Sequence, residues 1–337
     1  MDDLPAPPVN ALFQALPAAA ELVGWMPLGR FPTRVERIEG LLPRGVDLWV
    51  KREDESAERY GGNKVRKLEF LLGEARRAGH TRIVTFGGTG SHHVAATAIH
   101  GGAQGFDVEA VLFPQPYDSH VRELLLADRA AGAKLIHVGG LGAVWLHRWK
   151  AQRRRDTAWL AGGGSSAIGT LGWVSGGFEI LAQVETGALP RPDAIYCALG
   201  SCGTLAGIWW SLAAQPMELV GVRVVGRPIG SWMTRRLRRA VDRLLLPLGH
   251  SARIERAHLR VEHGFLGSGY GWPTPASRAA VELAARHGLH LDPIYTGKVM
   301  AALLADARAG RLDGKRVLFL HTQSAADLTP LTALFEA

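Results

Sequence analysis

The chain has 337 residues, of which 47% are hydrophobic and 21% are charged. This composition is typical of a globular protein, and it excludes an intrinsically disordered chain, a collagen and a disulfide-rich scaffold. The 39 Lys and Arg residues outnumber the 31 Asp and Glu residues, which gives a net charge of +8, but only seven of the basic residues are lysines. A function that needs a lysine amine therefore has seven candidates, and three of them, Lys51, Lys64 and Lys67, lie within seventeen residues.

The positive charge raises the question of nucleic acid binding. The densest basic runs, 147–155 and 235–243, fall in helical patterns that are typical of a solvated helix face, and the sequence contains no recognised nucleic-acid motif. We therefore expect no nucleic-acid partner. The two cysteines, Cys197 and Cys202, are too few for a disulfide framework and fit a reducing compartment, which predicts a cytoplasmic protein.

Two segments bear on targeting. The acidic start, Met1-Asp2-Asp3, lacks the basic flank and apolar core of a signal peptide, so we expect none. The stretch 194–217 contains no charged residue and is long enough to span a bilayer. A glycine-containing turn, Gly200-Ser201-Cys202-Gly203-Thr204, interrupts it near the middle. We therefore interpret the stretch as a buried strand, a loop and a buried helix, and expect no membrane partner.

Short β-branched runs alternate with helical patterns along the chain. In chain order, the patterns predict a strand at 83–86, a helix at 91–103, a strand at 108–113, a helix at 119–131, a strand at 135–138, a long helix to about 160, a helix at 172–185, a strand at 194–198, a helix at 204–214, a strand at 219–225, helices at 232–246, 275–287 and 298–309, and a strand at 317–320. Such alternation predicts an α/β fold with two interleaved three-layer α/β/α domains and mostly parallel sheets. Ligands of such sheets bind beyond the carboxyl ends of the strands.

The motif Gly61-Gly62-Asn63-Lys64-Val65-Arg66-Lys67-Leu68-Glu69 lacks the spacing of a Walker A loop. One interpretation is a plain helix N-terminus with basic residues. The other is a lysine beside a glycine turn, where its amine is desolvated and forms a Schiff base with a carbonyl cofactor. The spacing alone does not choose between them.

Two further glycine turns join a strand to a helix. The turn Gly200-Ser201-Cys202-Gly203-Thr204 has the character of a phosphate cup, because its amides and the helix dipole favour an anion, although an unliganded tight turn has the same pattern. The turn Gly87–Gly90 precedes Ser91, which is expected to cap the following helix. The adjacent His92 and His93 point to different sides of that helix, so we expect no metal site there.

Two more segments, taken separately, are typical of turns. They are Asp292-Pro293-Ile294-Tyr295-Thr296-Gly297-Lys298 and His321-Thr322-Gln323. Together, these segments resemble the pyridoxal-phosphate (PLP) enzymes of fold type II, the tryptophan-synthase β-subunit fold. More narrowly, they resemble the family of D-cysteine desulfhydrase and 1-aminocyclopropane-1-carboxylate deaminase. The resemblance extends from about Lys51 to Thr322 and includes the loop Gly163-Gly164-Ser165-Ser166 and the turn Gly269-Tyr270-Gly271.

The resemblance implies a division into domains and a role for each motif. Residues 1–66 and 179–337 would form a larger PLP-binding domain, and residues 67–178 a smaller domain that closes over the active site. Lys64 would carry the cofactor as a Schiff base and act as a catalytic residue together with Ser91 and Tyr295. The cofactor-binding residues would be Lys64, Lys67, His92, Gly200, Ser201, Cys202, Gly203, Thr204, Tyr295, Thr296 and Thr322. The substrate-binding residues would be Ser91, His92, His93, Gly164, Ser165 and Tyr270.

Position 296 favours one branch of this family. The deaminases resemble this chain but carry a Glu where Thr296 stands. A carboxylate there keeps the ring nitrogen protonated and strengthens the electron sink, whereas a hydroxyl supports it less. Since elimination of a good β-leaving group needs less carbanion stabilisation than the opening of a cyclopropane, Thr296 favours the desulfhydrase-like branch.

The chain also departs from the family pattern. It has Gly90-Ser91-His92-His93 where the family usually reads Gln-Ser-Asn followed by Gln or His, so His92 takes the place of an Asn expected to contact the phenolic oxygen of the cofactor. Cys202 stands where small residues are usual, and Gln323-Ser324 replaces Gly-Gly. These changes leave the cofactor prediction in place and bear on the substrate.

We therefore predict a PLP-dependent lyase that catalyses α,β-elimination from cysteine, favouring the D form, or from a related β-substituted amino acid, to give pyruvate and ammonia. The alternatives are a 1-aminocyclopropane-1-carboxylate deaminase, a cysteate lyase and a β-replacement synthase. From a different class come a non-catalytic PLP-binding protein and a basic nucleic-acid-binding protein. The family resemblance also implies a homodimer.

Overall fold

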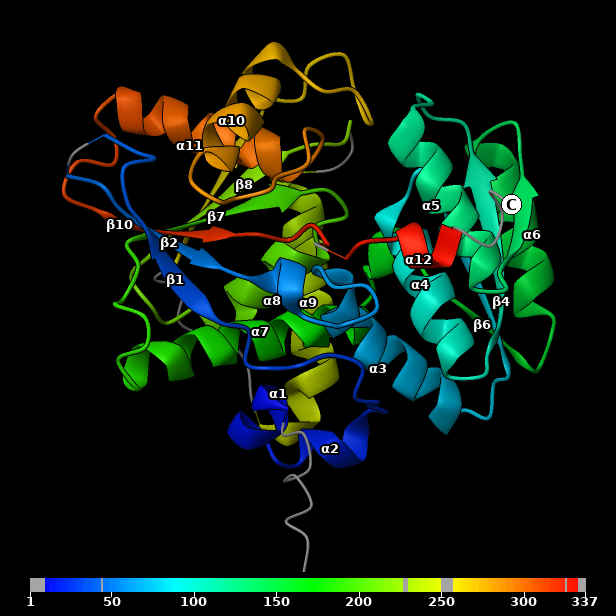
Figure 1. The fold of residues 1–337 in the computed structure, drawn as a ribbon. Helices are drawn as coiled ribbons and strands as arrows, with labels where there is room; N and C mark the ends of the chain where they lie inside the picture. The colour runs from blue at the N-terminus through cyan, green and yellow to red at the C-terminus, as the bar shows by residue number, and fades with distance from the viewer. Residues whose placement is uncertain (1–9, 44, 227–229, 250–256, 325, 333–337) are drawn as a thin grey trace, which may run out of the picture.

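The computed structural model describes residues 10–43, 45–226, 230–249, 257–324 and 326–332. The acidic start of the chain lies outside these residues. Within them, the strands form a six-stranded sheet of order β1-β2-β10-β7-β8-β9 and a four-stranded sheet of order β5-β4-β3-β6. All neighbouring strands are parallel except β1 and β2. The predicted α/β class with mostly parallel sheets is confirmed, and Figure 1 shows the two sheets side by side with helices around each.

The larger sheet is built from β1 (Val35–Ile38), β2 (Asp47–Lys51), β7 (Ala194–Leu199), β8 (Glu218–Arg223), β9 (His258–Glu262) and β10 (Arg316–Leu320). Successive residues of a strand point to opposite faces. Val317 and Phe319 accordingly pack on one face with α10 (Pro275–Ala285) and α11 (Thr296–Arg308), whereas Leu318 and Leu320 pack on the other with α8 (Gly203–Ser211) and α9 (Ser231–Leu245). Both faces are therefore buried, which explains the uninterrupted apolar run of β10.

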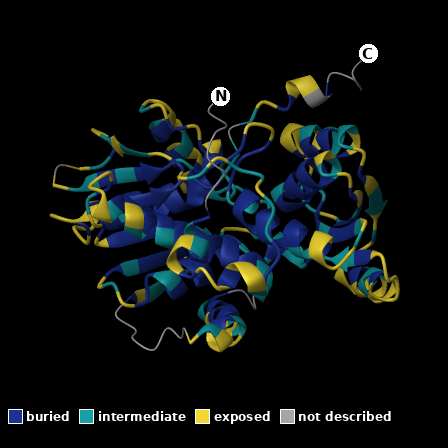
Figure 2. Cartoon of the chain, turned by 90° about the horizontal axis from the view of Figure 1, so that it is seen from below, coloured by how far each residue is buried: buried dark blue, intermediate teal, exposed yellow. Residues whose placement is uncertain are grey.

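The smaller sheet contains β3 (Arg82–Gly88), β4 (Asp107–Phe113), β5 (Lys134–His137) and β6 (Thr157–Trp159). One face packs on α3 (Lys64–Arg77), α4 (His92–Ala103) and α5 (Ser119–Ala130), and the other on α6 (Leu141–Gln152). Figure 2 shows that the buried residues fill the interior of both halves, with exposed residues at the rim.

Two predicted elements differ from the structure. The helix expected to run to about 160 ends at Gln152, and β6 follows it and pairs with β3. Three residues are too short a segment for a periodic strand signal. The helix expected from 172 begins at Ala167, as part of α7 (Ala167–Glu185). Its glycines argue against a helix by propensity, but Gly172 lets α7 approach α3 so closely that a Cβ there would lie 2.0 Å from the carbonyl oxygen of Arg66.

The remaining short elements are α1 (Ala11–Ala15), α2 (Ala19–Leu22), α12 (Thr329–Thr332) and three 3-10 turns at Glu53–Glu55, Gly162–Gly164 and Leu246–Leu248. The uncharged stretch 194–217 forms β7, a turn and α8, as expected. No described helix is both long and apolar enough to cross a membrane. Helices α3 and α7 each cross a predicted domain boundary, at 66/67 and 178/179, so the boundaries themselves stay a prediction.

Candidate functional site

A cavity of about 520 Å³ lies where the carboxyl ends of strands from both sheets meet, and its wall includes Phe86 and Gly87 of β3 and Ala198 of β7. Most predicted site residues line this cavity, namely Lys64, Ser91, His92, His93, Gly200, Ser201, Cys202, Thr204, Tyr270, Tyr295 and Thr322. The other predicted site residues do not line the cavity, namely Lys67, Gly164, Ser165, Gly203 and Thr296. No Asp or Glu is among the described residues that line the cavity.

Lys64 is the first residue of α3 and projects from the turn Gly61-Gly62-Asn63. Gly62 has φ +90°, and a Cβ there would lie 2.9 Å from the carbonyl oxygen of Thr322, so the turn requires glycine. The Lys64 amine donates a hydrogen bond of 2.8 Å to Oδ1 of Asn63. Burial lowers the pKa of Lys64 to about 8. A substantial fraction of this amine is therefore neutral, and able to act as a nucleophile or a base, near neutral pH.

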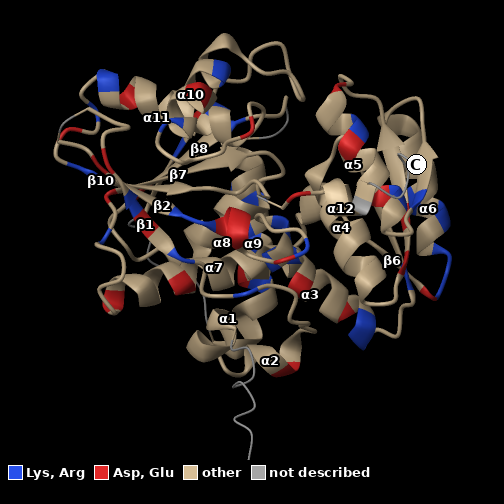
Figure 3. Cartoon of the chain, in the orientation of Figure 1, with Lys and Arg blue, Asp and Glu red and all other residues tan. Residues whose placement is uncertain are grey.

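A buried ion-pair network fixes the helix that carries Lys64. Arg66 donates to Oε2 of Glu53 at 2.7 Å and to Oε1 of Glu179 at 2.8 Å, and Lys51 donates to the same Glu179 oxygen at 2.6 Å. Burial opposes ionisation of Glu179, but Arg66 and Lys51 outweigh it and lower its pKa to about 2. The network joins α3 to β2 and α7, and Figure 3 marks along the ribbon where basic and acidic residues lie, these three elements included. Since each ion is paired, the network holds Lys64 in a defined position.

Lys67 lies one turn after Lys64 and faces the start of α8. Its amine donates to the carbonyl oxygen of Gly163 and to Oγ of Ser165, both at 3.0 Å. The Ser165 oxygen also accepts from the amide of Gly203, the first residue of α8, at 3.2 Å. Burial, followed by repulsion from Lys64, holds the pKa of Lys67 well below its usual value. Within the described residues no carboxylate forms an ion pair with Lys67.

These contacts describe a site prepared for an anion. A buried amine without a counter-charge is costly, and an anion at the N-terminus of α8 would supply that charge. The residue before α8, Cys202, takes φ +68°. This left-handed conformation costs a residue other than glycine roughly 1–2 kcal/mol. The structure thus keeps the shape of the predicted phosphate cup even with a cysteine in it.

The two histidines at the N-terminus of α4, His92 and His93, contact different residues. Ser91 caps the helix, as expected, because its side chain accepts from the amide of Val94. Nε2 of His93 meets Oγ1 of Thr85 at 3.0 Å. His92 turns instead toward Tyr60, whose hydroxyl lies 2.6 Å from Nδ1 of His92. The two rings therefore do not converge.

His92 sits in a group of polar and aromatic side chains at one end of the cavity. The amide nitrogen of Gln323 lies 3.0 Å from Nε2 of His92, and Nε2 of His120 lies 3.4 Å from the same atom. Tyr295 packs edge-on against the His92 ring, with ring centroids 5.8 Å apart. Burial, followed by the proximity of His120, lowers the pKa of His92 to about 3. The ring is therefore neutral at physiological pH, with one donor and one acceptor nitrogen.

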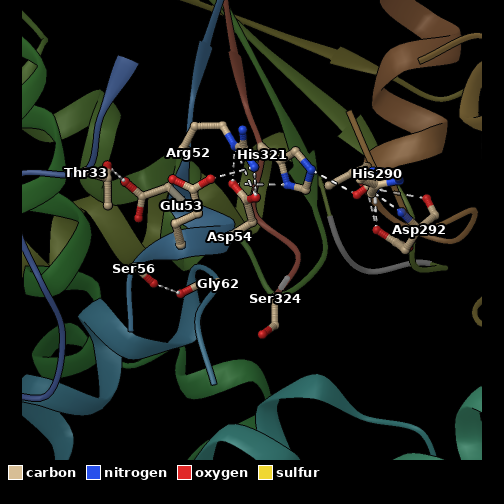
Figure 4. Close-up of polar contacts among 12 residues, drawn as sticks. Thr33, Arg52, Glu53, Asp54, Ser56, Gly62, His290, Asp292, His321 and Ser324 are labelled. Carbon is tan, nitrogen blue, oxygen red and sulfur yellow. Dashed lines mark hydrogen bonds and ion pairs between the residues drawn. The ribbon is translucent and has the colours of Figure 1, made fainter. Parts of the chain in front are cut away.

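The turn that carries Tyr295 and Thr296 is held by Asp292. Its Oδ1 accepts from the amides of Ile294 and Tyr295, and its Oδ2 accepts from the hydroxyl of Thr296 at 2.6 Å. Figure 4 shows Asp292 beside His290, whose carbonyl oxygen contacts His321 at 3.0 Å. The turn directs Tyr295 to the cavity, where its hydroxyl donates to that of Tyr270 at 2.8 Å.

The two threonines predicted to bind the cofactor are placed differently. Thr322 lines the cavity, whereas the side chain of Thr296 is buried and engaged by Asp292. The preference for a hydroxyl over a carboxylate at the ring nitrogen therefore depends on Thr322 and on the absence of acidic groups from the described lining. The role given to Thr296 stays a prediction.

Sequence reasoning missed two residues of this site. Tyr60 lines the cavity and directly precedes the Gly61-Gly62 turn, so its place beside the motif was the available signal. His120 lies at the start of α5, and no local pattern relates it to His92. The sequence showed Gln323 only as a departure from the family pattern. In the structure, its side chain contacts His92.

Comparisons with known proteins show which family the chain resembles. Residues 26–323 match the family described as pyridoxal-phosphate dependent enzymes. The chain is 35% identical to the nocardicin C-9' epimerase of Nocardia uniformis subsp. tsuyamanensis, over 89% of this chain and 92% of that protein. It is 33% identical to the D-cysteine desulfhydrase of Klebsiella pneumoniae, over 88% of this chain and 93% of that protein. A solved structure of a homologue of ACC deaminase, the 1-aminocyclopropane-1-carboxylate deaminase, superimposes with a TM-score of 0.78 at 28% identity, covering 95% of this chain and 99% of that one.

Proposed function

The chain belongs to the family of pyridoxal-phosphate dependent enzymes, and on this premise we propose that it eliminates the β-substituent of a small amino acid, with D-cysteine as the favoured substrate. The family membership confirms the predicted cofactor and enzyme class. The relatives also confirm the predicted group, that of the PLP-dependent lyases named D-cysteine desulfhydrase and ACC deaminase. The substrate within that group is the part that we propose.

The residues present fit PLP. Lys64 offers an amine of lowered pKa to its carbonyl group, and the buried amine of Lys67 with the N-terminus of α8 offers a site for its phosphate. When bound, the cofactor supplies an electron sink for the carbon from which a proton is removed. Tyr295 and Thr322 stand at the wall where the ring would be held.

The side chains of the cavity then have separate tasks. The amine of Lys64, neutral in part at pH 7, removes the proton from the substrate Cα. Ser91 uses its hydroxyl oxygen as the acceptor for the Val94 amide, so its own proton remains for the substrate carboxylate. His92, as a neutral ring, adds no charge beside the reacting amino acid. After the β-substituent leaves, hydrolysis of the released enamine gives pyruvate and ammonia.

One observation carries the choice of elimination. The described lining of the cavity contains the Lys64 amine and the Thr322 hydroxyl but no carboxylate. A ring nitrogen that meets a hydroxyl withdraws electrons less strongly than one held protonated by an acid. Such a site suits substrates with a good leaving group, such as a thiol, better than the opening of a cyclopropane. Cysteate and other β-substituted alanines satisfy the same condition, and β-replacement would begin with the same step.

A second candidate is epimerisation at the Cα of an amino acid. The nocardicin C-9' epimerase is 35% identical to the chain. In addition, the hydroxyl of Tyr60 gives the cavity a proton carrier besides Lys64. Elimination and epimerisation share the removal of the Cα proton. They differ in whether the β-substituent leaves or a proton returns.

A product assay in D₂O separates these functions. The purified holoenzyme is given D-cysteine, L-cysteine, β-chloroalanine and 1-aminocyclopropane-1-carboxylate, and the products are identified by mass spectrometry and chiral chromatography. The proposal expects pyruvate and sulfide from D-cysteine, and neither from a Lys64→Ala variant. Formation of 2-oxobutanoate from the cyclopropane substrate alone would assign the deaminase. Deuterated, inverted amino acid without pyruvate would assign the epimerase.

A further inference from the structure

A line of three side chains runs from the cavity to the surface of the protein. The Tyr60 hydroxyl lies at the cavity wall and 2.6 Å from Nδ1 of His92. Nε2 of His92 lies 3.4 Å from Nε2 of His120. His120, at the start of α5, is exposed, and its Nδ1 lies 3.4 Å from Oε2 of Glu123. The line thus has a buried end inside the site and an end in solvent.

We propose that Tyr60, His92 and His120 form a proton relay that delivers solvent protons to the reacting amino acid, as a second proton carrier besides Lys64. The inference deepens the proposed function, on which it rests for the identity of the substrate. The relay itself requires only that a proton be returned to a carbon or a leaving group inside the cavity.

The protonation state of His92 suits this task. Its ring is neutral, so one nitrogen can accept a proton while the other gives one up. The amide nitrogen of Gln323 lies 3.0 Å from Nε2 and 3.3 Å from Nδ1 of His92, so this contact leaves both tautomers of the ring open. The relay uses the tautomer with the proton on Nδ1, which faces Tyr60. The Tyr60 hydroxyl accepts that hydrogen bond and keeps its own proton free for the cavity. In this tautomer the line is set to donate inward.

The surroundings keep His92 from becoming a fixed cation. Tyr60, Tyr295, Gln323 and His120 contact the ring, and none of them is an acid that would hold it protonated. Among more distant charges, Lys64 lowers the pKa of His92 and Asp292 raises it. Glu123 contacts His120, the end of the line that reaches solvent.

Each transfer conserves the number of protons on the line. Tyr60 gives its hydroxyl proton to the substrate, His92 passes its Nδ1 proton to the Tyr60 oxygen, and His120 passes a proton to Nε2 of His92. Water then returns one proton to His120. His92 ends as its other tautomer, with the proton on Nε2, which is the state that can carry a proton outward in the reverse step.

Histidine NMR tests the resting state without any reaction. In the ¹⁵N-histidine-labelled holoenzyme, the relay expects a neutral His92 with its proton on Nδ1 at pH 7. In the Tyr60→Phe variant the chemical shift of Nδ1 should change, because that nitrogen loses its partner. A proton on Nε2 at rest would overturn the proposal, because the Tyr60 hydroxyl would then donate to His92 and not to the cavity.

Deuterium exchange tests the transfer itself. Alanine has no leaving group, so incorporation of deuterium at its Cα does not depend on elimination. We expect Tyr60→Phe and His120→Gln to lower the rate of incorporation by roughly tenfold or more, since a positioned acid or base contributes about 10²–10⁴-fold. Added imidazole should restore His120→Gln but not Tyr60→Phe.

The exposed His137 at the end of β5 provides the matched control, and His137→Gln should leave the incorporation rate unchanged. Equal incorporation by the parent enzyme and all three variants would overturn the relay, even if elimination from cysteine is observed. Failure of elimination with a relay intact in both experiments would instead overturn only the proposed substrate and reaction.

Discussion

The two ends of the cavity are prepared for different kinds of group. At the lysine end, α3 holds the amines of Lys64 and Lys67 away from water, and burial lowers the pKa of both. The Lys67 amine contacts Ser165, which also accepts from the first amide of α8. At the histidine end, Tyr60 and His92 are neutral, and their hydrogen bonds lead to solvent through His120. The first end suits an anion that stays in place. The second suits a group whose protonation changes during a reaction.

The largest expected effect comes from the lysine end. Lys64→Ala removes both the amine that binds the carbonyl of the cofactor and the base for the Cα proton. Turnover should fall by at least about 10²–10⁴-fold, and the visible absorption of the bound cofactor should be lost. Spectra and product assays measure both. Lys315→Ala, which removes an exposed lysine, should change neither. Retention of full activity by Lys64→Ala would contradict the assignment.

The buried ion-pair network around Arg66 should contribute strongly to the free energy of unfolding. Glu179→Gln leaves Arg66 and Lys51 with one carboxylate fewer, and loss of a partner from a buried ion pair costs about 3–5 kcal/mol. The exposed pair of Arg30 and Glu58 is the control, because Glu58→Gln should cost about 0–1 kcal/mol. Urea unfolding of the two variants gives the difference. Similar free energies of unfolding would show that the network is not what fixes α3.

The same network predicts how stability depends on acid. The pKa of Glu179 in the folded protein is about 2, below its ordinary value of 4.5. The ionised side chain therefore stabilises the fold above pH 4.5, and this contribution is lost as the pH falls from 4.5 toward 2. Unfolding free energies between pH 6 and pH 3 should fall more steeply for the parent protein than for Glu179→Gln. Parallel curves would count against the ion pairs.

A smaller effect is expected from Lys67→Met. The variant keeps the apolar stem but removes the amine that would meet the phosphate. A hydrogen bond to a charged group is worth about 1.5–3 kcal/mol, so PLP should bind roughly 10- to 150-fold more weakly. Inorganic phosphate should compete with PLP for the parent apoprotein and less well for the variant. Unchanged PLP affinity and phosphate competition would place the phosphate elsewhere.

The smallest effect concerns pH. Because burial lowers the pKa of Lys64 to about 8, the neutral amine becomes the main form above that pH. The rate at which the apoprotein takes up PLP should rise with pH and reach half of its maximum near pH 8. A midpoint near the ordinary lysine value of 10.5 would show that the amine is not desolvated.

The residues at the two ends of the cavity follow from the sequence to different degrees. The turn before α8 follows a local rule, in which a helix N-terminus creates an anion site, whereas the spacing around Lys64 leaves two interpretations open and the family resemblance favours the Schiff-base lysine. The contact of His92 with His120 joins residues 28 positions apart through the packing of α4 on α5. No propensity or residue spacing in either segment predicts the contact of His92 with His120. Thr296 failed to reach the cavity wall because Asp292, in its own turn, engages its hydroxyl.

The fold shows the same division. The apolar runs of β3, β4, β5, β7, β8 and β10 predict strands, whereas β1, β2 and β9 were not predicted. Strand β6 has three residues and depends on its pairing with β3. The early start of α7 depends on close contact with α3, where a glycine is favoured by packing although helix propensity disfavours it.

The central claim is that Lys64, out of seven lysines, holds the cofactor. Reduction of the purified holoenzyme with borohydride converts a Schiff base into a stable secondary amine, and peptide mapping by mass spectrometry then locates it. We expect the pyridoxyl group on Lys64 alone. A group on Lys67, or on any of the other five lysines, would contradict it.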